Sequence, residues 1–329
     1  MAVNNHGEEP MRVWSSLILA AAVAAIPLQS HAETLKVAVP QRGSWETSIT
    51  PLGAQHGFFK AEGLDIEVTY TEGGASNEQA VISGSVDIAV QTGFLGIIAA
   101  YVKGAPVRII SPAATGAAEV FWYVKAGSPI TSLKQAHGKS VGFSNQGSSS
   151  NLIILQLLKE AGVEDAKPTP VGASPNGMPM VMTGQLDICY AVPPVGLKEL
   201  QEKKIVMVAR GNDSEIIRNE TVRVNAVNLN SLQTKRDAIV RFMRAYVKST
   251  DWAFAGDEAI QAFAKFADQD VETVRYMVKN FQSKDQDQIL EFKGTQRVLD
   301  EAYAAKRISK PMKPEDLKDL FDIVYKPSS

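Results

Sequence analysis

A run of small hydroxyl residues is the strongest chemical signal in this 329-residue chain. Residues 147–151 read Gly-Ser-Ser-Ser-Asn and stand between a predicted strand, 139–143, and an apolar helix from 149 to about 161. The first N–H groups of a helix lack internal acceptors and carry partial positive charge, and small residues let a ligand approach them. N-capping explains Ser148 but not all of its neighbours. The segment predicts a site for an anionic or polar group formed by Ser148, Ser149, Ser150 and Asn151.

Several other loops beyond predicted strands carry small, polar or rigid residues. Ligands of alternating strand–helix proteins bind at such loops. A Trp beside Gly43-Ser44 offers a flat apolar wall, with a packed aromatic as the alternative, and Pro193-Pro194 offers a rigid one. We predict a neutral pocket with hydrophobic sides, near which Arg42 and Glu46 are the only charges. Its further candidate residues are Ser44, Trp45, Gly74, Ala75, Gln91, Thr92, Gly93, Asn176, Tyr190, Pro193 and Pro194.

Residues that commonly carry catalysis are sparse. His56 and His137 fall in different halves of the chain without Asp, Glu or Cys at ligand spacing, whereas catalytic zinc usually has three protein ligands. The single cysteine, Cys189, excludes an internal disulfide and is interpreted as a buried small apolar residue. No Gly-x-Ser-x-Gly or Gly-x-Gly-x-x-Gly motif occurs. We predict no catalytic residue, no metal and no cofactor.

The N-terminus has the three-part pattern of a secretory signal peptide. Arg12 supplies a short positive region, residues 17–26 are apolar and Ala-rich, and 30–32 place small residues at both cleavage positions. The apolar stretch is short for a bilayer span, and no cysteine follows it for lipid attachment. We predict removal of residues 1–32 on export to the periplasm, with Met11 as an alternative start. A buried N-terminal helix is the other interpretation.

The composition is that of a soluble globular protein. The chain is 45% hydrophobic and 21% charged, with 34 basic and 36 acidic residues and a formal charge of −2. This balance gives no positive field for nucleic acid or an anionic membrane. The length suggests about two domains. We expect a monomer that contacts neither nucleic acid nor lipid.

The chain repeats one order of elements after about a hundred residues. Gly-x-Val-Asp-Ile at 84–88 returns as Gly-x-Leu-Asp-Ile at 184–188, and Gly-Ala-Ser at 74–76 returns at 172–174. Predicted strands at 35–39, 65–70, 139–143 and 167–171 alternate with helices at about 48–61 and 149–161, with Pro51 in a first turn and Ser76 as an N-cap. Strands that alternate with helices predict parallel sheets covered on both faces. Two such units predict two α/β lobes that face each other across a cleft.

Two apolar strands, 119–125 and 221–227, are interpreted as crossovers between the lobes. The tail is predicted to be helical at 237–255, 257–266, 271–280, 288–305 and 314–325, with stripes of aromatic and aliphatic residues that pack onto the first lobe. We expect residues 33–123 and 222–329 to form lobe one and residues 124–221 to form lobe two.

Three segments resemble a family of periplasmic solute-binding proteins that serve ABC importers for sulfonates, taurine, nitrate and thiamine-pyrimidine precursors. They are Gly-Ser-Pro-Ile to Gly-Ser-Ser-Ser at 127–150, Gly-Phe-Phe-Lys-x-Glu-Gly-Leu-x-Ile-Glu at 57–67, and the motif at 84–88. The resemblance covers residues 34 to about 230 well and the helical tail weakly. It implies a two-lobed type II periplasmic-binding-protein fold, an anion pocket on the serine segment, and delivery of the solute to an ABC permease.

One loop departs from the family pattern. Relatives often carry Trp-Asp-Pro after the third strand of the second lobe, where this chain has Val192-Pro193-Pro194. The departure puts a sulfonate or taurine ligand in doubt and favours a partly apolar or aromatic solute. Two alternatives share the fold: an enzyme of thiamine-pyrimidine synthesis, which would rely on a cysteine-rich motif and a histidine, and a ligand-sensing partner of a membrane receptor.

Overall fold

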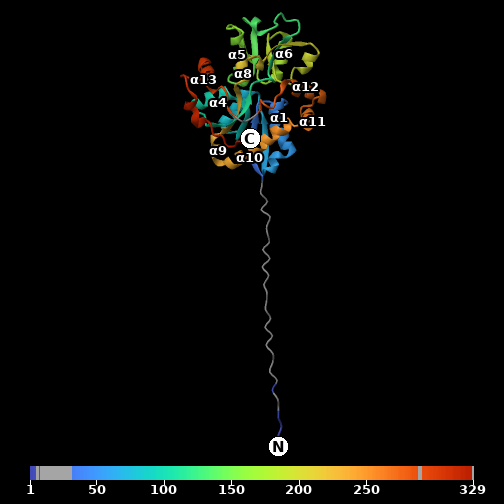
Figure 1. The fold of residues 1–329 in the computed structure, drawn as a ribbon, viewed down its shortest axis with the longest axis vertical. Coiled ribbons are helices and arrows are strands. Elements are labelled where there is room, and N and C mark those ends of the chain that lie inside the picture. Colours follow the sequence, from blue (N-terminus) through green and yellow to red (C-terminus); the bar gives the residue numbers. More distant parts are fainter. Residues whose placement is uncertain (5–6, 8–31, 288–290, 328–329) are drawn as a thin grey trace. The chain divides into compact units, whose positions relative to one another are not determined.

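The computed structural model describes residues 1–4, 7, 32–287 and 291–327. The chain divides into two compact units, Met1–His31 and Ala32–Ser329, and the fold described below is that of the second unit (Figure 1). The predicted signal peptide, with its alternative start at Met11, falls almost wholly outside the described residues. Within the described ranges, none of the helices combines the length and apolar character that a bilayer crossing requires.

Lobe one is built on a five-stranded sheet with the order β2-β1-β3-β10-β4. β1 pairs in parallel with β2 and β3, whereas β10 runs antiparallel between β3 and β4. Leu35, Val37 and Val39 are fully buried on one face of β1, and Ala38 is fully buried on the other, whereas Lys36 near the start of the strand is exposed. The strands are β1 Glu33–Val39, β2 Leu64–Tyr70, β3 Ile88–Gly93, β4 Val107–Thr115 and β10 Thr221–Asn228.

Lobe two repeats this strand order. A three-stranded sheet β8-β5-β9 and a two-stranded sheet β6-β7 are joined by a parallel bridge between Val141 and Ile188. The combined order, β7-β6-β8-β5-β9, matches lobe one strand for strand and agrees with the repeat in the sequence. In both lobes the crossover strand, β5 or β10, is antiparallel, so the sheets are mixed rather than purely parallel. The strands are β5 Phe121–Lys125, β6 Ser140–Phe143, β7 Lys167–Pro170, β8 Cys189–Ala191 and β9 Ile205–Arg210.

Helices follow the strands in both lobes. In Figure 1, α5 and α6 lie in one lobe, and α9 and α10 lie in the other. The helices of lobe one are α1 Trp45–His56, α2 Phe58–Ala61, α3 Gly74–Ser83 and α4 Phe94–Val102. Those of lobe two are the 3-10 helices η1 Leu133–Gln135 and η2 Ser174–Asn176, with α5 Ser149–Glu160, α6 Gly177–Thr183 and α7 Leu197–Gln201.

Two helix boundaries of lobe one differ from the sequence prediction. The expected helix over 48–61 begins earlier, at Trp45, which places Pro51 in its second turn, and it is divided by Gly57, whose φ of 95° ends α1. The N-cap of α3 is Gly73, so Ser76 lies inside the first turn. A side chain at Gly73 would meet Ser144 of lobe two, since a Cβ there would lie 2.3 Å from the serine Oγ.

The repeated Asp of the two lobes performs the same structural task in each. Asp87 accepts the Lys36 N–H of β1 at 2.9 Å, and Asp187 accepts the Ser140 N–H of β6 at 2.9 Å. Asp87 also accepts hydrogen bonds from Ser231 and Lys235. Burial alone would raise the pKa of Asp87, but these donors outweigh it and the pKa is lowered. The Asp of each Gly-x-x-Asp-Ile repeat therefore connects its own segment to the backbone of the neighbouring strand by a hydrogen bond.

Replacing Asp87 with Asn is expected to lower the free energy of unfolding at neutral pH by about 2 kcal/mol, because a charge-assisted acceptor is lost. A carboxyl with a lowered folded pKa stabilises the fold above its unfolded pKa, and this contribution disappears as pH falls through the folded value. Urea denaturation should show the deficit at pH 7 and a smaller one near about pH 3. An equal deficit at both pH values would contradict the assignment.

Two connections pass between the lobes and hydrogen-bond to each other. Residues 116–120 lead from β4 to β5, and residues 211–220, with η3 Gly211–Asp213 and α8 Glu215–Arg218, lead from β9 to β10. The Gly116 N–H donates to the Glu220 carbonyl at 2.9 Å, and the Gly211 N–H donates to the Val120 carbonyl at 2.8 Å. We call this paired segment, residues 116–120 and 211–220, the hinge, because it forms the connection between the two lobes.

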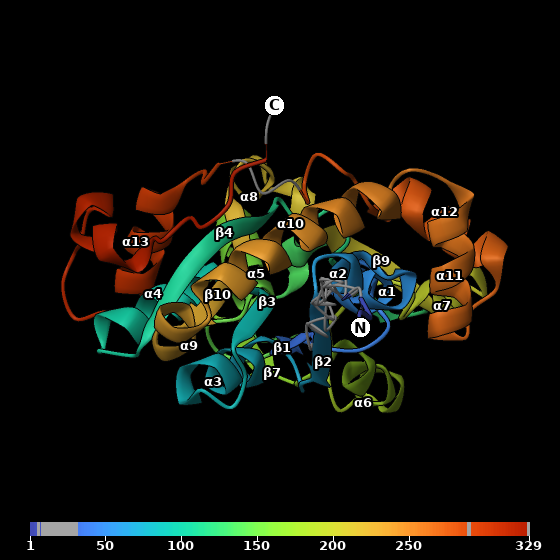
Figure 2. The same ribbon diagram turned by 90° about the horizontal axis from the view of Figure 1, so that it is seen from below.

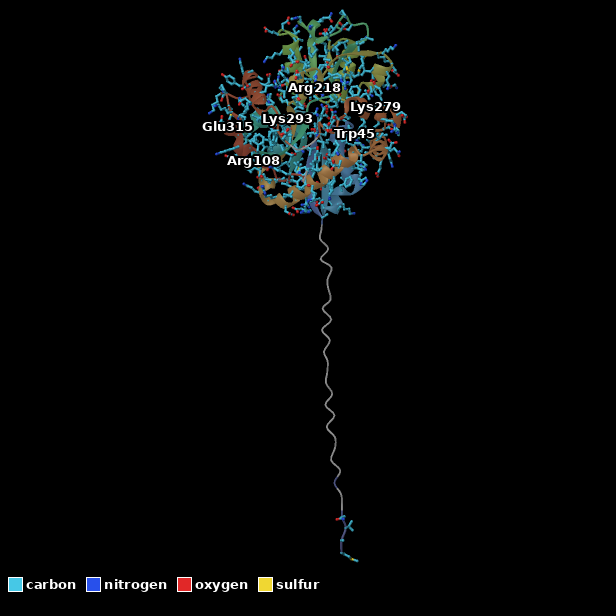
Figure 3. All side chains as sticks on the ribbon, viewed as in Figure 1. Trp45, Arg108, Arg218, Lys279, Lys293 and Glu315 are labelled. Atoms are coloured by element: carbon cyan, nitrogen blue, oxygen red, sulfur yellow. The ribbon has the colours of Figure 1, made fainter. Side chains whose placement is uncertain are left out.

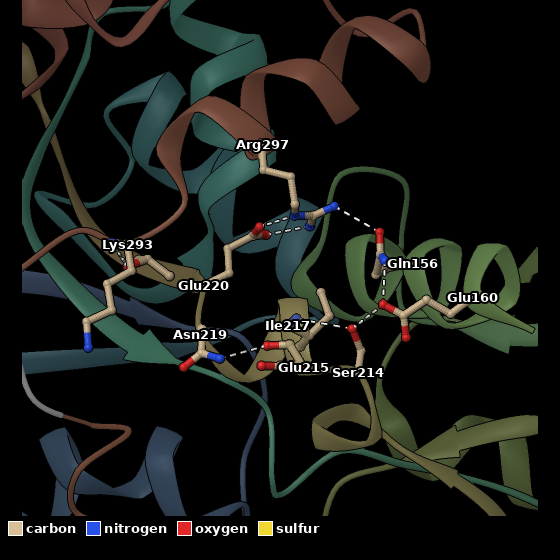
Figure 4. Close-up of polar contacts among 10 residues, drawn as sticks. Gln156, Glu160, Ser214, Glu215, Ile217, Asn219, Glu220, Lys293 and Arg297 are labelled. Atoms are coloured by element: carbon tan, nitrogen blue, oxygen red, sulfur yellow. Dashed lines mark hydrogen bonds and ion pairs between the residues drawn. The ribbon is translucent and has the colours of Figure 1, made fainter.

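A polar network beside the hinge joins the tail to lobe two (Figure 4). Arg297 of α13 forms an ion pair with the buried Glu220 and donates to Gln156 Oε1 of α5 at 3.0 Å. Glu160 accepts from Gln156 and from Ser214, each within 2.7 Å. The network holds α5, the helix that begins at the serine segment, against the hinge.

The tail packs mainly on lobe one. α10 lies against α1 and α2, and α13 lies against α4 (Figure 2). The expected helix over 288–305 is α13, which starts at residue 295, and residues 288–290 are not described. The segment expected to be helical over 314–325 forms only a 3-10 helix, because Phe321 bridges to Ile109 at the edge of the sheet. The elements are α9 Leu229–Thr234, α10 Arg236–Ala253, α11 Asp257–Ala267, α12 Val271–Phe281, α13 Thr295–Ala304 and η4 Pro314–Leu320.

Candidate functional site

A cavity of about 60 Å³ lies between the lobes, where the carboxyl ends of β1, β3, β6 and β8 meet. Both lobes and the hinge contribute to it, as expected for an α/β sheet whose ligands bind beyond the strand ends. The first turns of α1, α3 and α5 face the cavity. It is lined by Pro40, Gln41, Ser44, Glu46, Thr47, Gly73, Gly74, Gln91, Gly93, Val120, Ser144, Ser148, Ser149, Ser150, Tyr190, Val192 and Arg223.

The structure brings eight of the residues predicted from sequence together around this cavity. They come from loops and helix starts of both lobes, far apart in the chain. They are Ser44, Gly74, Gln91, Gly93, Ser148, Ser149, Ser150 and Tyr190.

The other seven candidates do not line the cavity in the described part of the chain. Trp45, which is labelled in Figure 3, is buried against Phe254 and Phe263. The tail helices cover that face of α1, so Trp45 packs in the core and is absent from the cavity lining. The amides of Asn151 and Asn176 bond to backbone groups of their own loops. Pro194 lines a separate groove beside α7. The full set is Trp45, Ala75, Thr92, Asn151, Asn176, Pro193 and Pro194.

Sequence reasoning missed the groups that carry the charge of the site. Glu46 was noted only as a nearby charge, and Arg223 lies in a strand interpreted as a crossover. A signal was available: Arg223 and Asn225 are isolated polar residues in the otherwise apolar run 221–227, and a buried polar residue is more informative than an exposed apolar one. The other missed lining residues are Pro40, Gln41, Thr47, Gly73, Val120, Ser144 and Val192.

The serine segment presents backbone donors to the cavity. Ser148 is the N-cap of α5, and its hydroxyl accepts the Asn151 N–H. The hydroxyl of Ser150 accepts the Ser144 N–H at 2.9 Å. Within the described residues, the N–H groups of Ser149 and Ser150 have no protein acceptor, as expected in the first turn of a helix. These two N–H groups can therefore donate hydrogen bonds to an acceptor atom of a ligand.

Arg223 connects the lobes across the cavity. Its guanidinium forms a buried ion pair with Glu119 and donates through Nε to the Ser149 hydroxyl at 3.2 Å. Arg223 is 8% exposed and Glu119 is 3% exposed, so the pair is screened from water. The bond to Ser149 joins β10 of lobe one directly to α5 of lobe two.

Two further carboxyls lie near this ion pair. Burial raises the pKa of Glu46 to about 7, with a further rise from the negative charge of Glu119. Burial also raises the pKa of Asp287 well above its usual value, and Glu46 and Glu119 add to that rise. Arg223 opposes both shifts. The site therefore contains three carboxyl groups around one guanidinium, and the raised pKa values of Glu46 and Asp287 favour their neutral forms.

Glycines of lobe one allow the serine segment to come close. A Cβ on Gly93 would lie 2.7 Å from the Gly147 carbonyl oxygen and 3.2 Å from the Ser148 Cα. A Cβ on Gly74 would lie 2.9 Å from the Ser148 Cβ. Gln41 adds a polar contact, since its Oε1 accepts the Ser174 N–H of lobe two at 3.3 Å. The lobes are therefore closed on each other in this structure.

The residues considered for metal or thiol chemistry lie away from the cavity. The side chains of His56 and His137 contact Glu258 and Asp165 at the surface. Cys189 begins β8 and is buried, and burial raises the pKa of its thiol to about 12. Among the described residues, no three His, Cys, Asp or Glu side chains are grouped as metal ligands.

Known proteins resemble this chain in sequence and in fold. The family model described as NMT1/THI5 like matches residues 48–260. The 4-amino-5-hydroxymethyl-2-methylpyrimidine phosphate synthase THI13 of Saccharomyces cerevisiae is 21% identical over 227 residues, which make up 66% of this chain and 65% of that protein. The chain therefore spans just under two thirds of the length of the curated relative it matches.

Two solved structures share the architecture. The alkanesulfonate-binding protein SsuA from Xanthomonas axonopodis pv. citri, bound to MOPS, has a TM-score of 0.72 at 16% identity, over 84% of this chain and 95% of that one. The periplasmic nitrate-binding protein NrtA from Synechocystis PCC 6803 has a TM-score of 0.68 at 13% identity, over 88% and 86%. The predicted two-lobed type II periplasmic-binding-protein fold is confirmed, and the chain belongs to the NMT1/THI5-like family.

Proposed function

We propose that this protein is an extracytoplasmic receptor that captures a small organic solute by closure of its lobes and delivers it to an ABC importer. The observation that carries the proposal is the cavity between the lobes, to which both lobes contribute polar groups without protein partners. On this proposal the chain is exported to the periplasm by a cleaved signal peptide, carries no lipid anchor, acts as a monomer and needs no cofactor.

Closure follows from the arrangement of these groups. A ligand between the lobes would contact the lobe-one residues and the N–H groups of Ser149 and Ser150 at once. The closed form then gains contacts that the open form lacks, so binding shifts the population towards closure. A micromolar receptor needs about 8 kcal/mol of net binding. A few hydrogen bonds at about 1 kcal/mol each, with apolar contacts from Val120 and Val192, can supply much of it.

The direct test is a thermal-shift screen of the mature protein against sulfonates, nitrate, aromatic carboxylates, amino acids and pyrimidines. A receptor should be stabilised by one class, and small-angle X-ray scattering should show a smaller radius of gyration with the best compound. A chain that neither binds nor contracts with any compound would contradict the proposal.

Ser149→Asp places a negative charge at the start of α5. We expect the affinity for a ligand with an anionic or acceptor end to fall at least about tenfold, because the charge repels the ligand and opposes the helix-end donors. Isothermal titration with the best compound from the screen measures the change. Ser85→Asp, on an exposed turn of lobe one, is the control. Equal affinity in wild type and Ser149→Asp would remove the serine segment from the binding site.

Catalysis is the second candidate function, because the curated relatives are named as pyrimidine phosphate synthases. The described residues that line the cavity include no His, Lys or Cys, which favours binding over a reaction of that kind. Incubation of the protein with its ligand, followed by mass spectrometry, separates the two. Turnover would support the enzyme. Sensing through a membrane receptor shares the same pocket and is separated from transport by an uptake assay with the permease.

A further inference from the structure

Among the described residues, two side chains of lobe one line the cavity with a buried acceptor atom that has no hydrogen-bond partner. These atoms are Oε1 of Glu46 and Oε1 of Gln91. Glu46 is 4% exposed and Gln91 is 3% exposed. The amide nitrogen of Gln91 already donates to the Tyr246 hydroxyl at 3.2 Å, which assigns its oxygen as the free atom.

The arrangement of Glu46 is costly for the protein alone. A buried carboxylate is tolerated when it is paired or accepts hydrogen bonds. The guanidinium of Arg223 is directed to Glu119 and Ser149, and the described residues contain no ion pair of Glu46. The other nearby titratable groups of the described chain give Glu46 no positive partner. Glu119 and Asp287 are carboxyls, and Tyr246 is a phenol whose raised pKa keeps it neutral. Burial raises the pKa of the Glu46 carboxyl more than hydrogen bonds from the Glu46 backbone and from the Gln282 side chain lower it, and Oε1 stays without a partner. This unpaired buried oxygen points to a ligand.

The two sides of the cavity offer opposite hydrogen-bonding groups to a ligand. Lobe two offers donors, the N–H groups of Ser149 and Ser150, which fit an acceptor or anionic group. Lobe one offers two acceptors, which an anion would leave unsatisfied or would repel. A group that carries hydrogen-bond donors satisfies both Glu46 and Gln91, and among such groups a positively charged nitrogen also offsets the carboxylate.

We propose that Glu46 and the Gln91 carbonyl form a subsite for a cationic nitrogen, and that the solute carries a protonated amine or amidine-like group at one end and an acceptor group at the other. This inference rests on the proposed function and narrows its ligand class. The expected solute is therefore not purely anionic, because it carries a cationic nitrogen at one end and an acceptor group at the other.

Three matched probes test the subsite: β-alanine, which has both ends, propionate, which has only the acid, and propylamine, which has only the amine. Isothermal titration at millimolar concentrations is expected to rank β-alanine first and propionate last. Glu46→Gln keeps the shape of the side chain and removes its charge, and should weaken β-alanine binding about 30-fold. Glu67→Gln, on the exposed face of β2, is the control and should leave binding unchanged.

The pH dependence gives a second readout. With a pKa of about 7, Glu46 gains its charge between about pH 6 and about pH 8, so β-alanine affinity should rise over that range in wild type and stay flat in Glu46→Gln. The ligand-free variant should be more stable than wild type at pH 8. A raised folded pKa means that the charge costs stability at high pH, and this difference should shrink as pH falls.

The outcomes separate this inference from the proposed function. Three outcomes would each overturn the cation subsite. Propionate could bind as tightly as β-alanine, neither amine could bind, or the Glu46→Gln variant could lose stability at pH 8. Lobe closure with a nitrogen-free compound from the wider screen would overturn the subsite and leave the receptor proposal standing. Absence of closure with every compound would reject the receptor proposal itself.

Discussion

Gly93→Ala is expected to abolish tight ligand binding while leaving the fold intact. The added Cβ would lie 2.7 Å from the Gly147 carbonyl oxygen, a distance at which one of the two segments must move. The shortest contact is with the backbone of lobe two, so it exists only when the lobes are closed. The contact of 3.1 Å with Glu78 Oε1 of lobe one involves the end of a side chain, which can move by a few tenths of an ångström. We expect affinity for the best compound to fall at least about tenfold, and the ligand-induced contraction in small-angle scattering to disappear.

Gly53→Ala is the matched control for this effect. Its Cβ would lie 2.0 Å from the Ser249 Oγ, inside the packing of α1 on α10 and far from the cavity. This variant should lose stability and keep its affinity, the opposite of Gly93→Ala. If Gly93→Ala binds and contracts like wild type, the lobes do not close by the approach of the serine segment to β3.

Arg223→Leu is expected to lower the free energy of unfolding by about 3 to 5 kcal/mol at neutral pH. Removing one partner of a buried ion pair leaves the other charge uncompensated, here Glu119 with Glu46 and Asp287 close by. The same change also raises the folded pKa values of Glu46 and Asp287 further, since Arg223 is the group that lowers them.

The sign of the pH effect follows from linkage. A carboxyl with a raised folded pKa binds more protons in the native state, so stability falls as pH rises. Urea denaturation should therefore show a larger deficit for Arg223→Leu at about pH 8 than at about pH 5.5. Arg218→Gln, an exposed arginine of the same connection that donates to the Asn212 carbonyl, serves as the control. A deficit that grows as pH falls would contradict the account.

The sequence predicted the architecture because local patterns and the internal repeat agree. The Asp of each Gly-x-x-Asp-Ile motif occupies the same place in both lobes, and Ser148 caps α5 as expected. Boundaries were wrong where another part of the molecule decides them. The N-cap of α3 is Gly73, where lobe two leaves no room for a side chain, and the last expected helix stops where Phe321 reaches the sheet edge.

The candidate site was only partly accessible from sequence for the same reason. Loops with small and hydroxyl residues were identified, because backbone chemistry can be inferred from neighbours in the chain. The charged groups were not, because Arg223 and Glu119 are 104 residues apart and meet only through the crossing of the two connections. Trp45 could not be placed either, since its partners Phe254 and Phe263 lie in a tail whose packing face is set by tertiary structure.

The position of β10 in the chain has a consequence for how the protein can be divided. The sheet of lobe one includes β10, which follows the whole of lobe two in the chain, so lobe one is not one continuous stretch of sequence. The strands of lobe two, in contrast, all fall within residues 121–210. A fragment that ends midway would lack an inner strand of its own sheet. The native pairings of β10 with β3 and β4 span more than a hundred residues, and such distant contacts slow folding. The sheet of lobe one is therefore complete only after the chain that follows lobe two has returned to it.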